Sequence, residues 1–380
     1  MCYNRCNSPV QPIVHSGVGK LVKADGIAAK FRKDIEEALA EPSARPRKPC
    51  LLGILSTSST PSRSYAQFTK KTCEAIGIEF VLKEVGGALK GGIDGEGVEE
   101  AIIEGNEDVN VDGIMVYYPI FGGSQDHYLQ QVVSPFKDVE GLHVKFHYNL
   151  YHNIRFIRPQ SLLGVPTPTQ SSPTLPTQTA DAPEGYVKSI IPCTPLAIVK
   201  ALEAIGVYNT ILDYGDRAYG RTVTIINRSE VVGRPLAALL ANDGARVFSV
   251  DIDSIQEYTK RPTVTTNGTE KVKRYNPRHV VHPCSMTLEQ CLALSDVVVS
   301  AVPSVSYKVK TEWLKDGCIC VNVASEKNFE SDVREKASLY MPAVGKITQM
   351  MLLRNLLRLC HYRELLEATQ PNITATSQSS

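Results

Sequence analysis

The segment Val223–Leu240 (VTIINRSEVVGRPLAALL) constrains the fold more than any other part of the chain. Four β-favouring residues, Val223–Ile226, lead directly into a polar turn, and apolar residues recur at helical spacing from Leu236 onwards. A strand that feeds a helix through a short glycine-containing turn puts backbone N–H groups and a positive helix end where a phosphate can bind. The segment therefore predicts the start of a nucleotide-binding βαβ unit, although the strict GxGxxG pattern is absent.

An acid follows the second predicted strand of this unit. The strand is Ala245–Val250 (ARVFSV), and Asp251 comes directly after it. In a dinucleotide-binding unit, an acid at this position accepts hydrogen bonds from the adenosine ribose and repels a 2′-phosphate. Asp251 therefore predicts that the cofactor is NAD.

The composition sets the class of protein. A chain of 380 residues, with 43% hydrophobic residues and a net charge of +1, is long enough for two globular domains and is not a binder of nucleic acid. No stretch approaches the ~20 apolar residues that span a membrane, and the first residues show no secretory or import signal. The ten cysteines form no CxxC pair, and Cys318 and Cys320 alternate along a predicted strand as core thiols. We expect a cytoplasmic protein without a metal site.

Strands and helices alternate before the central turn as well. In residues 56–77 we expect a helix with Pro61 as its first helical residue and Gly77 as its C-cap. The other elements expected there are a helix Ala24–Leu39, a strand Cys50–Leu55, a strand Glu79–Glu84, a helix Val98–Asn106 and a strand Val111–Tyr118. This alternation predicts a small parallel sheet covered by helices.

The remaining elements predict a second α/β domain around the central turn. They are helices Pro195–Ile205 and Met286–Leu294, and strands Asp296–Ala301 and Gly317–Val323. A last, strongly amphipathic helix is expected at Ile347–Leu359.

Three polar stretches interrupt this pattern. Arg158–Pro183 is rich in Pro, Ser, Thr and Gln, so we expect a mobile surface insertion whose removal from about Leu162 to Ala182 leaves turnover nearly unchanged. Lys260–Pro283 is expected to be irregular, and Ala368–Ser380 to be a polar tail.

Three motifs in the same order resemble those of the methylenetetrahydrofolate dehydrogenase/cyclohydrolase family, over roughly residues 20–365. The family's G-R-S-x-x-V-G-x-P appears as Asn227–Pro235, with asparagine in place of the first glycine. Its P-C-T-P appears intact as Pro192–Pro195, and its K-D-V-D-G appears as Lys137–Gly141, with Glu140 in place of aspartate.

The chain also departs from the bifunctional members of that family. Their Y-x-x-x-K motif supplies a lysine for cyclohydrolase chemistry, and here Tyr65 is followed by Thr69. Their V-Q-L-P-L-P carries a glutamine where this chain has Tyr117, and their P-G-G-V-G-P-M-T has become Pro342–Thr348. This combination is similar to the family's monofunctional, NAD-dependent cytosolic branch in fungi.

The chemistry of the family explains why these losses are tolerated. Removing a hydride from a methylene bridge between two nitrogens leaves a delocalised cation, so positioning and electrostatics suffice without a general base. Hydrolysis of the methenyl product needs proton transfers by a tuned group. The resemblance therefore implies a methylenetetrahydrofolate dehydrogenase without cyclohydrolase activity. Lys70 and Lys71 are rotated away from the Thr69 direction on a helix, so neither is expected to replace the lysine.

The candidate site residues combine these motifs. The substrate-site candidates are Tyr65, Thr69, Tyr117, Glu140, Cys193 and Thr194. The NAD-site candidates are Asn227, Arg228, Ser229, Val232, Gly233, Arg234, Pro235, Asp251, Ile252, Ser300, Ala301 and Val302. Cys193 is not expected to act as a nucleophile, because hydride transfer needs none. Arg228 could attract a phosphate, pair with Asp251 or touch NAD.

The expected architecture is α/β, with an N-terminal folate domain, a Rossmann-type NAD-binding domain and a cleft between them. Residues 20–193 form the first domain, residues 194–344 form the second, and the helix at 345–365 packs back on the first. The resemblance implies a homodimer that acts in one-carbon metabolism. Two alternatives stay open: a bifunctional dehydrogenase–cyclohydrolase, and a nucleotide-binding regulator without catalysis. Thr69 and Tyr117 argue against the former, and the retained motifs argue against the latter.

Overall fold

Three parallel strands form the core of the N-terminal domain. Their order in the sheet is β3-β2-β4. The strands are β2 (Cys50–Leu55), β3 (Glu79–Glu84) and β4 (Gly113–Val116). β2 is central and fully buried, as expected for a short apolar run between two parallel neighbours. The computed structural model describes residues 17–41, 47–164, 181–260 and 277–369.

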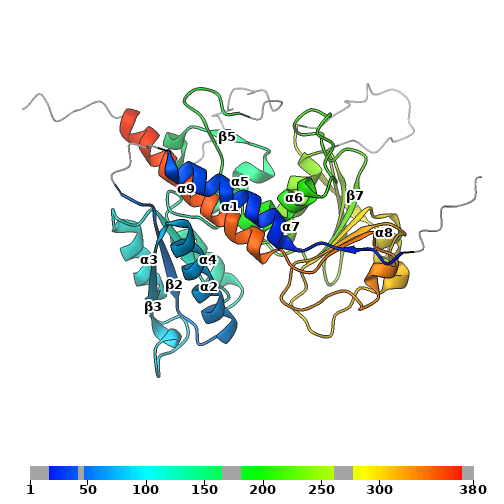
Figure 1. Ribbon diagram of the computed structural model, residues 1–380, viewed down its shortest axis with the longest axis horizontal. Coiled ribbons are helices and arrows are strands. Elements are labelled where there is room, and N and C mark those ends of the chain that lie inside the picture. The colour runs from blue at the N-terminus through cyan, green and yellow to red at the C-terminus, as the bar shows by residue number, and fades with distance from the viewer. Residues whose placement is uncertain (1–16, 42–46, 165–180, 261–276, 370–380) are drawn as a thin grey trace, which may run out of the picture.

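Helices cover both faces of this sheet (Figure 1). The helices of this domain that come after β2 in the chain are α2 (Thr60–Ile76), α3 (Val98–Glu107), α4 (Ser124–Val132) and α5 (Val144–Tyr151). α2 begins where Ser59 accepts a hydrogen bond from the Ser62 N–H, and it ends at Gly77, whose φ of 92° is left-handed. The predicted C-cap Gly77 is therefore confirmed, and the helix begins at Thr60, one residue before the predicted Pro61. α4 and α5 were not predicted.

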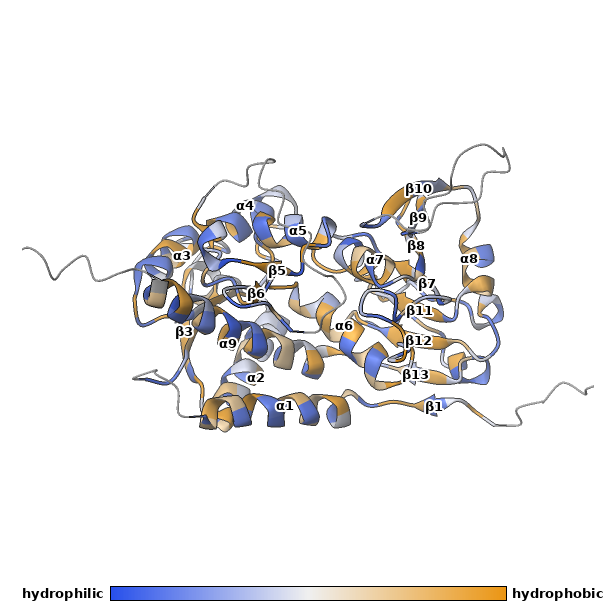
Figure 2. Cartoon of the chain, turned by 90° about the horizontal axis from the view of Figure 1, so that it is seen from above, coloured by the Kyte–Doolittle hydropathy of each residue, from blue (hydrophilic) through white to orange (hydrophobic). Residues whose placement is uncertain are grey.

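The second domain is built on an eight-stranded sheet in the order β1-β13-β12-β11-β7-β8-β9-β10. Figure 2 labels these strands in that order from one edge of the sheet to the other. Its strands are β1 (Lys20–Leu21), β7 (Thr222–Ile226), β8 (Arg246–Val250), β9 (Ile255–Thr259), β10 (Val280–Cys284), β11 (Val297–Ser300), β12 (Ile319–Asn322) and β13 (Leu339–Met341). Along this order, all neighbours from β1 to β8 pair parallel, whereas the pairs β8–β9 and β9–β10 are antiparallel.

The two faces of this sheet bury alternate residues of each strand. Val223 and Ile225 belong to a cluster with α6 (Cys193–Ala204) and α7 (Gly233–Asn242). Ile226 belongs to the cluster on the opposite face, near α8 (Leu288–Leu294). Burial on both faces explains the nearly continuous Val/Ile runs of the central strands.

Two long helices connect the domains. α1 (Ala24–Ala40) leaves the second sheet from β1, and α9 (Gly345–Thr369) leaves it after the neighbouring parallel strand β13. They therefore run side by side in the same direction towards the N-terminal domain (Figure 1). β1 lies in the sheet of the second domain, so the chain crosses between the domains earlier than the predicted boundaries imply.

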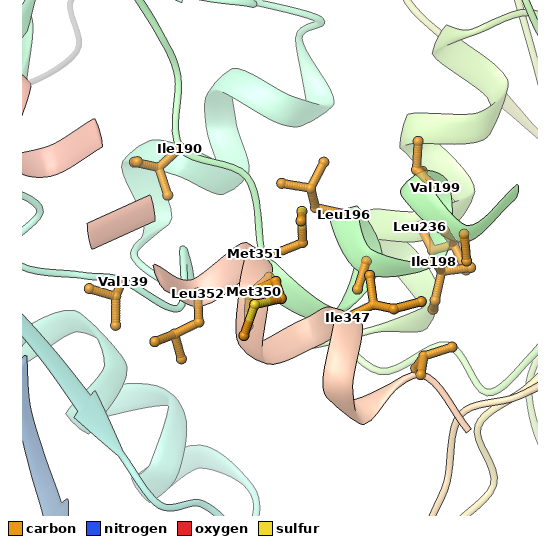
Figure 3. Close-up of a cluster of buried hydrophobic side chains, with 14 of the residues drawn as sticks. Val139, Ile190, Leu196, Ile198, Val199, Leu236, Ile347, Met350, Met351 and Leu352 are labelled. Carbon is orange, nitrogen blue, oxygen red and sulfur yellow. The ribbon is translucent and has the colours of Figure 1, made fainter. Parts of the chain in front are cut away.

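Helix α9 is packed in the core between the domains, which differs from the arrangement that its sequence predicted. Its residues Ile347, Met350 and Met351 interleave with Leu196 and other side chains of α6 (Figure 3). From Ile347 to Cys360, every residue of α9 is buried or half-buried. The expected strongly amphipathic pattern was therefore wrong, because a helix shared by two domains has little surface facing water.

Short elements make up the rest of the described chain. β5 (Phe156–Ile157) and β6 (Val187–Lys188) pair antiparallel as a two-stranded sheet. The 3₁₀-helices are η1 (Gly86–Ala88), η2 (Pro159–Leu162), η3 (Thr311–Trp313) and η4 (Val333–Glu335).

Two stretches that were predicted to be irregular contain regular structure at one end, so the predictions were wrong there. The expected insertion Arg158–Pro183 begins with η2, in which Leu162 is buried against the main core and its carbonyl accepts a hydrogen bond from Lys145 Nζ. Residues 165–180 of that stretch lie outside the described residues. The expected irregular stretch Lys260–Pro283 ends in β10, which pairs along its whole length with β9; residues 261–276 lie outside the described residues.

This correction changes the expected effect of a deletion. Replacing residues 165–180 with a Gly/Ser linker of equal length should leave the turnover number within about twofold, because a Pro/Ser/Thr/Gln segment offers little apolar surface. Leu162→Ala should lower the free energy of unfolding by about 2–4 kcal/mol, since Leu162 is only 4% exposed. Urea unfolding and steady-state rates test both; equal stability for both variants would contradict the placement of Leu162.

Candidate active site

The loop that holds the predicted substrate acid is fixed by its own charged residues. In Lys137–Gly141, Lys137 donates to two backbone carbonyl groups at 2.7 and 2.8 Å. Asp138 accepts three backbone N–H groups at 2.8 to 3.1 Å. Glu140 makes one such contact, because its Oε2 accepts the N–H of Val116, at the end of β4, at 3.2 Å. Lys137 and Asp138 therefore shape the loop, and Glu140 is placed at the carboxyl end of the sheet.

The surroundings of Glu140 favour its neutral form. Burial, and then the charge of Asp138, raise the pKa of Glu140 to about 8, and the Val116 N–H opposes that rise. Burial raises the pKa of Asp138 to about 6. Among the described residues, no lysine or arginine contributes to the pKa of Glu140. A cationic ligand would therefore find a carboxyl group without a competing positive charge.

Glu140 should make the folded protein less stable as the pH rises. Its folded pKa of about 8 lies above the ordinary 4.5, so its contribution is fully present below pH 4.5 and is lost as the pH rises through 8. Glu140→Gln cannot ionise, so we expect it to reduce the loss of stability between pH 5 and pH 8 by roughly 1–3 kcal/mol. Urea unfolding at the two pH values measures this. If the free energy of unfolding changed equally with pH in wild type and variant, the raised pKa of Glu140 would be contradicted. Asp138 is present in both proteins, so it does not cause a difference between them.

Two tyrosines and a threonine lie beside Glu140. The rings of Tyr65, in α2, and Tyr117, directly after β4, meet edge to face with centroids 6.0 Å apart. Burial raises the pKa of both hydroxyls, and the Glu140 charge adds to the rise. Thr69 is completely buried beside the Tyr117 hydroxyl, and its Oγ1 donates to the Tyr65 carbonyl at 2.9 Å. The Tyr117 hydroxyl is itself buried, with Thr69 beside it and no hydrogen bond of normal geometry to another described residue.

The neighbouring lysines do not replace the missing amine. Lys70 and Lys71 are exposed, and Lys70 Nζ lies 3.9 Å from Glu74 on the outer face of α2. The prediction that neither lysine points where Thr69 points is confirmed.

Cys193 and Thr194 lie at the first turn of α6, where the acid loop crosses the chain. The Cys193 N–H donates to the Glu140 carbonyl at 3.0 Å. Gly141 has a φ of 75°, and a Cβ there would approach the Pro192 nitrogen to 2.8 Å, so glycine permits this crossing. Burial, and then the Glu140 charge, raise the pKa of the Cys193 thiol to about 12. The thiol is therefore protonated, which agrees with the expectation that it is no nucleophile.

One residue that holds this site together was missed. Asn355, in α9, is completely buried, and its Nδ2 donates to the carbonyls of Val139 (2.9 Å) and Ile191 (3.0 Å). It therefore joins the acid loop to the turn before α6. The available signal was a lone asparagine inside the apolar run of this helix.

The turn after β7 is closed by its own side chains. Asn227 has a φ of 102°, a left-handed conformation that asparagine tolerates better than most residues. Its Oδ1 accepts the Ser229 N–H at 2.7 Å, and its Nδ2 donates to the Ala301 carbonyl at 2.8 Å. Gly233 passes so close to Asn227 that a Cβ would lie 1.6 Å from the Asn227 carbonyl oxygen. Asn227 thus replaces the family's glycine with a residue that also ties the turn to the next strand.

Arg228 is committed to the hairpin that follows β8. Its guanidinium makes four hydrogen bonds to Ser249 and Ser254, at 2.6 to 3.2 Å. Asp251 Oδ2 lies 4.0 Å from Arg228 Nη1, and the Asp251 side chain is 46% exposed. Ile252 is 95% exposed at the tip of the turn. Of the three roles considered for Arg228, the structure supports a distant pairing with Asp251.

Ser300, Ala301 and Val302 lie at the end of β11, next to the turn. Ser300 Oγ donates to Asn328 Oδ1 at 3.1 Å, and the Val302 N–H donates to the same oxygen at 2.9 Å. Asn328 Nδ2 returns a hydrogen bond to the Val302 carbonyl at 2.9 Å. Asn328 was not predicted, because it lies after β12 and outside every motif used.

The remaining residues of the turn contact the N-terminal domain or the core. Arg234 pairs with Glu230 and lies 5.0 Å over the ring of Tyr151 in α5, whose hydroxyl donates to Glu230 at 2.9 Å. Val232 packs against the core, and Pro235 is buried in α7. The candidates Asn227, Asp251 and Ala301 directly follow β7, β8 and β11, whose carboxyl ends meet at one edge of a parallel sheet.

Comparisons with known proteins identify the family. Residues 22–140 match the description "Tetrahydrofolate dehydrogenase/cyclohydrolase, catalytic domain", and residues 192–271 match its "NAD(P)-binding domain". Proteins named methylenetetrahydrofolate dehydrogenase [NAD(+)] from Schizosaccharomyces pombe and Saccharomyces cerevisiae are 43% and 42% identical. The matches cover 90% and 91% of this chain and 94% and 98% of theirs. The chain belongs to the tetrahydrofolate dehydrogenase/cyclohydrolase family.

A solved structure supports this placement. That of the NAD-dependent 5,10-methylenetetrahydrofolate dehydrogenase from Saccharomyces cerevisiae has a TM-score of 0.77 and 42% identity, and the match covers 92% of this chain and all of the other. The expected α/β fold, with the catalytic and NAD(P)-binding domains of the tetrahydrofolate dehydrogenase/cyclohydrolase family, is thus confirmed.

The residues of the family's NAD(P)-binding domain fit a dinucleotide. The N–H groups of Val231 and Gly233, at the start of α7, have no acceptor among the described residues, so they are available to phosphate oxygens. Asp251 offers a half-exposed carboxylate at the end of the next strand. Within the described ranges no group of three or more His, Cys, Asp or Glu side chains could hold a metal ion. No described helix combines the length and apolarity needed to cross a membrane.

Proposed function

We propose that this protein oxidises methylenetetrahydrofolate to methenyltetrahydrofolate by hydride transfer to NAD and has no cyclohydrolase activity. The observation that carries the proposal is the buried pair Thr69–Tyr117, next to a Glu140 that has no cationic partner among the described residues. The names of the relatives from two yeasts support the same substrate and cofactor.

Each side chain of the site has a role that suits hydride removal. The partly buried ring of Tyr65, packed edge to face against the buried Tyr117 ring, would offer the folate an apolar surface. Glu140 faces the developing cation, and its ionised form becomes more favourable when that charge appears. No proton leaves with the hydride, so the protonated Cys193 thiol is not required as a base.

The cofactor residues act by binding and orientation. The α7 N-terminus would hold the pyrophosphate, and Asp251 would accept hydrogen bonds from the adenosine ribose. NAD supplies the hydride acceptor when bound. Asn227 keeps the turn against β11, and Asn328 keeps the next loop in register with it.

Hydrolysis of the methenyl group lacks its proton carrier here. Water must be added to the product and protons must move between oxygen and nitrogen. Thr69 has one hydroxyl proton, which is donated to the Tyr65 carbonyl. A threonine hydroxyl does not ionise near neutral pH, so it is no substitute for a tuned lysine.

The cellular setting forms part of the proposal. All eight cysteines in the described ranges are free thiols, which suits a reducing compartment such as the cytoplasm. We propose that the protein acts there in one-carbon (folate and purine) metabolism, as a homodimer.

Absorbance tests both activities on the purified chain. With methylenetetrahydrofolate and NAD we expect enzyme-dependent formation of NADH, and with methenyltetrahydrofolate we expect decay at the uncatalysed rate. NAD binding without turnover would support the regulator alternative, and enzyme-dependent decay of the methenyl compound would support the bifunctional one.

A further inference from the structure

A cavity of about 160 Å³ lies between the domains, and none of the six substrate-site candidates lines it. Its walls come from α5, α6, α7, α9 and the strand β6. It runs along α6, where it touches Leu196, Val199 and Glu203, whereas Cys193 and Thr194 at the start of that helix do not line it.

The cavity walls carry more positive than negative charge. Two ion pairs on the walls cancel: Lys200 with Glu203 at 2.7 Å, and Arg155 with Asp243 at 2.6 Å. Three cations are left, namely Lys188, Arg354 and Arg358.

Carboxylates offset these three cations only in part. Among the described residues, neither Arg354 nor Arg358 forms an ion pair within 4 Å, although the charges of Asp34 and Glu203 act on Arg354. Arg358 donates to the Ser189 carbonyl at 3.1 Å, and Arg354 lies 5.4 Å over the ring of Phe31. Lys188 lies 3.9 Å from Asp181, whose side chain is 99% exposed. Burial, and then the charges of Arg358 and Arg354, lower the pKa of Lys188, as expected for cations gathered around one space.

The residues outside the described ranges add little negative charge. Glu270 is the one acidic side chain among them, and its stretch 261–276 also contains four basic residues, Arg261, Lys271, Lys273 and Arg274. Because the cations on the walls outnumber the carboxylates by three, the electrostatic potential in the cavity favours an anion from solution.

The walls also indicate the shape of that anion. Besides the cations, the cavity is bounded by apolar side chains such as Phe156, Leu196 and Leu239, and by the ring of Tyr214. An engineered apolar cavity of about 150 Å³ holds a benzene molecule. A phosphate monoester carries about −1.5 to −2 charges and offers three acceptor oxygens to arginine forks, so it balances three cations better than a single carboxylate does.

We propose that this cavity, which we call the rear anion site, binds a small organic phosphate monoester whose apolar body is no larger than a six-membered ring. Lys188, Arg354 and Arg358 hold the phosphate, and the apolar walls hold the body. Since the walls come from both domains, the bound anion joins the domains and raises the thermal stability of the whole chain.

Phenyl phosphate is the probe for calorimetry and thermal unfolding of the full chain. Saturating NAD is present, so that the cofactor's own phosphate site is blocked. We expect saturable binding and a rise in Tm, with benzoate and inorganic phosphate each binding at least tenfold more weakly. Lys188→Met should weaken phenyl phosphate binding at least tenfold, and Lys90→Met, which removes an exposed charge elsewhere, should change it less than twofold.

Arg358→Met provides a second variant, and its Tm without ligand shows whether it is folded. A folded Arg358→Met protein should also bind phenyl phosphate at least tenfold more weakly. The proposal is overturned if wild type shows no saturable binding, if Lys188→Met binds as tightly as wild type, or if benzoate matches phenyl phosphate. Binding is read without turnover, so these outcomes are independent of the dehydrogenase assay.

Discussion

Thr69→Lys should leave methenyl hydrolysis at the uncatalysed rate and lower the free energy of unfolding by about 1–3 kcal/mol. Thr69 is completely buried, and the Tyr117 ring beside it is 2% exposed, so the longer side chain of a lysine has no room there. A buried ammonium group also loses hydration, which disfavours its charged form. The motif lysine alone therefore does not restore the activity that the family's bifunctional members possess.

The double variant Thr69→Lys/Tyr117→Gln should behave differently. The smaller glutamine vacates part of the ring volume and supplies an amide next to the new amine, so we expect hydrolysis at least tenfold above background. Tyr117→Gln alone is the matched control and should stay at background. Decay of methenyltetrahydrofolate absorbance gives the rate, and urea unfolding gives the stability. Hydrolysis by the single Thr69→Lys variant would show that the tyrosine does not obstruct the lysine.

The sequence predicted the elements whose signals are local. The strands Cys50–Leu55 and Glu79–Glu84 were located to the residue, because short apolar runs bounded by turn residues identify buried parallel strands. β10 was missed, because its partner β9 is separated from it by a long polar stretch and pairing at that distance leaves no periodic signal. The burial of α9 depends on two domains at once, which a helical pattern cannot show.

The same distinction holds for the site. Motif residues such as Glu140 and Asn227 were found because their chemistry is written in consecutive residues. Asn355 and Asn328 were missed, because each acts on backbone groups far away in the chain. The rear anion site was missed for a similar reason: Lys188 and Arg358 are 170 residues apart in the sequence and meet only in the folded protein.

NAD should exceed NADP in kcat/KM by at least tenfold, which corresponds to roughly 1.4 kcal/mol or more. In the proposed NAD site, the Asp251 carboxylate would lie near the 2′-phosphate of NADP, and like charges at that distance repel. The opposing attraction would have to come from Arg228. Its side chain is only 11% exposed and is held by four hydrogen bonds to Ser249 and Ser254, so turning outward to a phosphate would break them.

Asp251→Ser should narrow that ratio mainly by weakening NAD, because serine makes weaker hydrogen bonds to the ribose than a carboxylate does. Asp251→Asn keeps the shape and removes the charge, so it isolates the repulsion and should improve kcat/KM for NADP. Asp253→Asn is the matched control: it removes an exposed charge from the same turn and should change the ratio less than twofold. Initial rates with both cofactors measure the ratio. If wild type used both cofactors equally, or if Asp251→Ser and Asp253→Asn had the same effect, the carboxylate of Asp251 would not be what selects NAD.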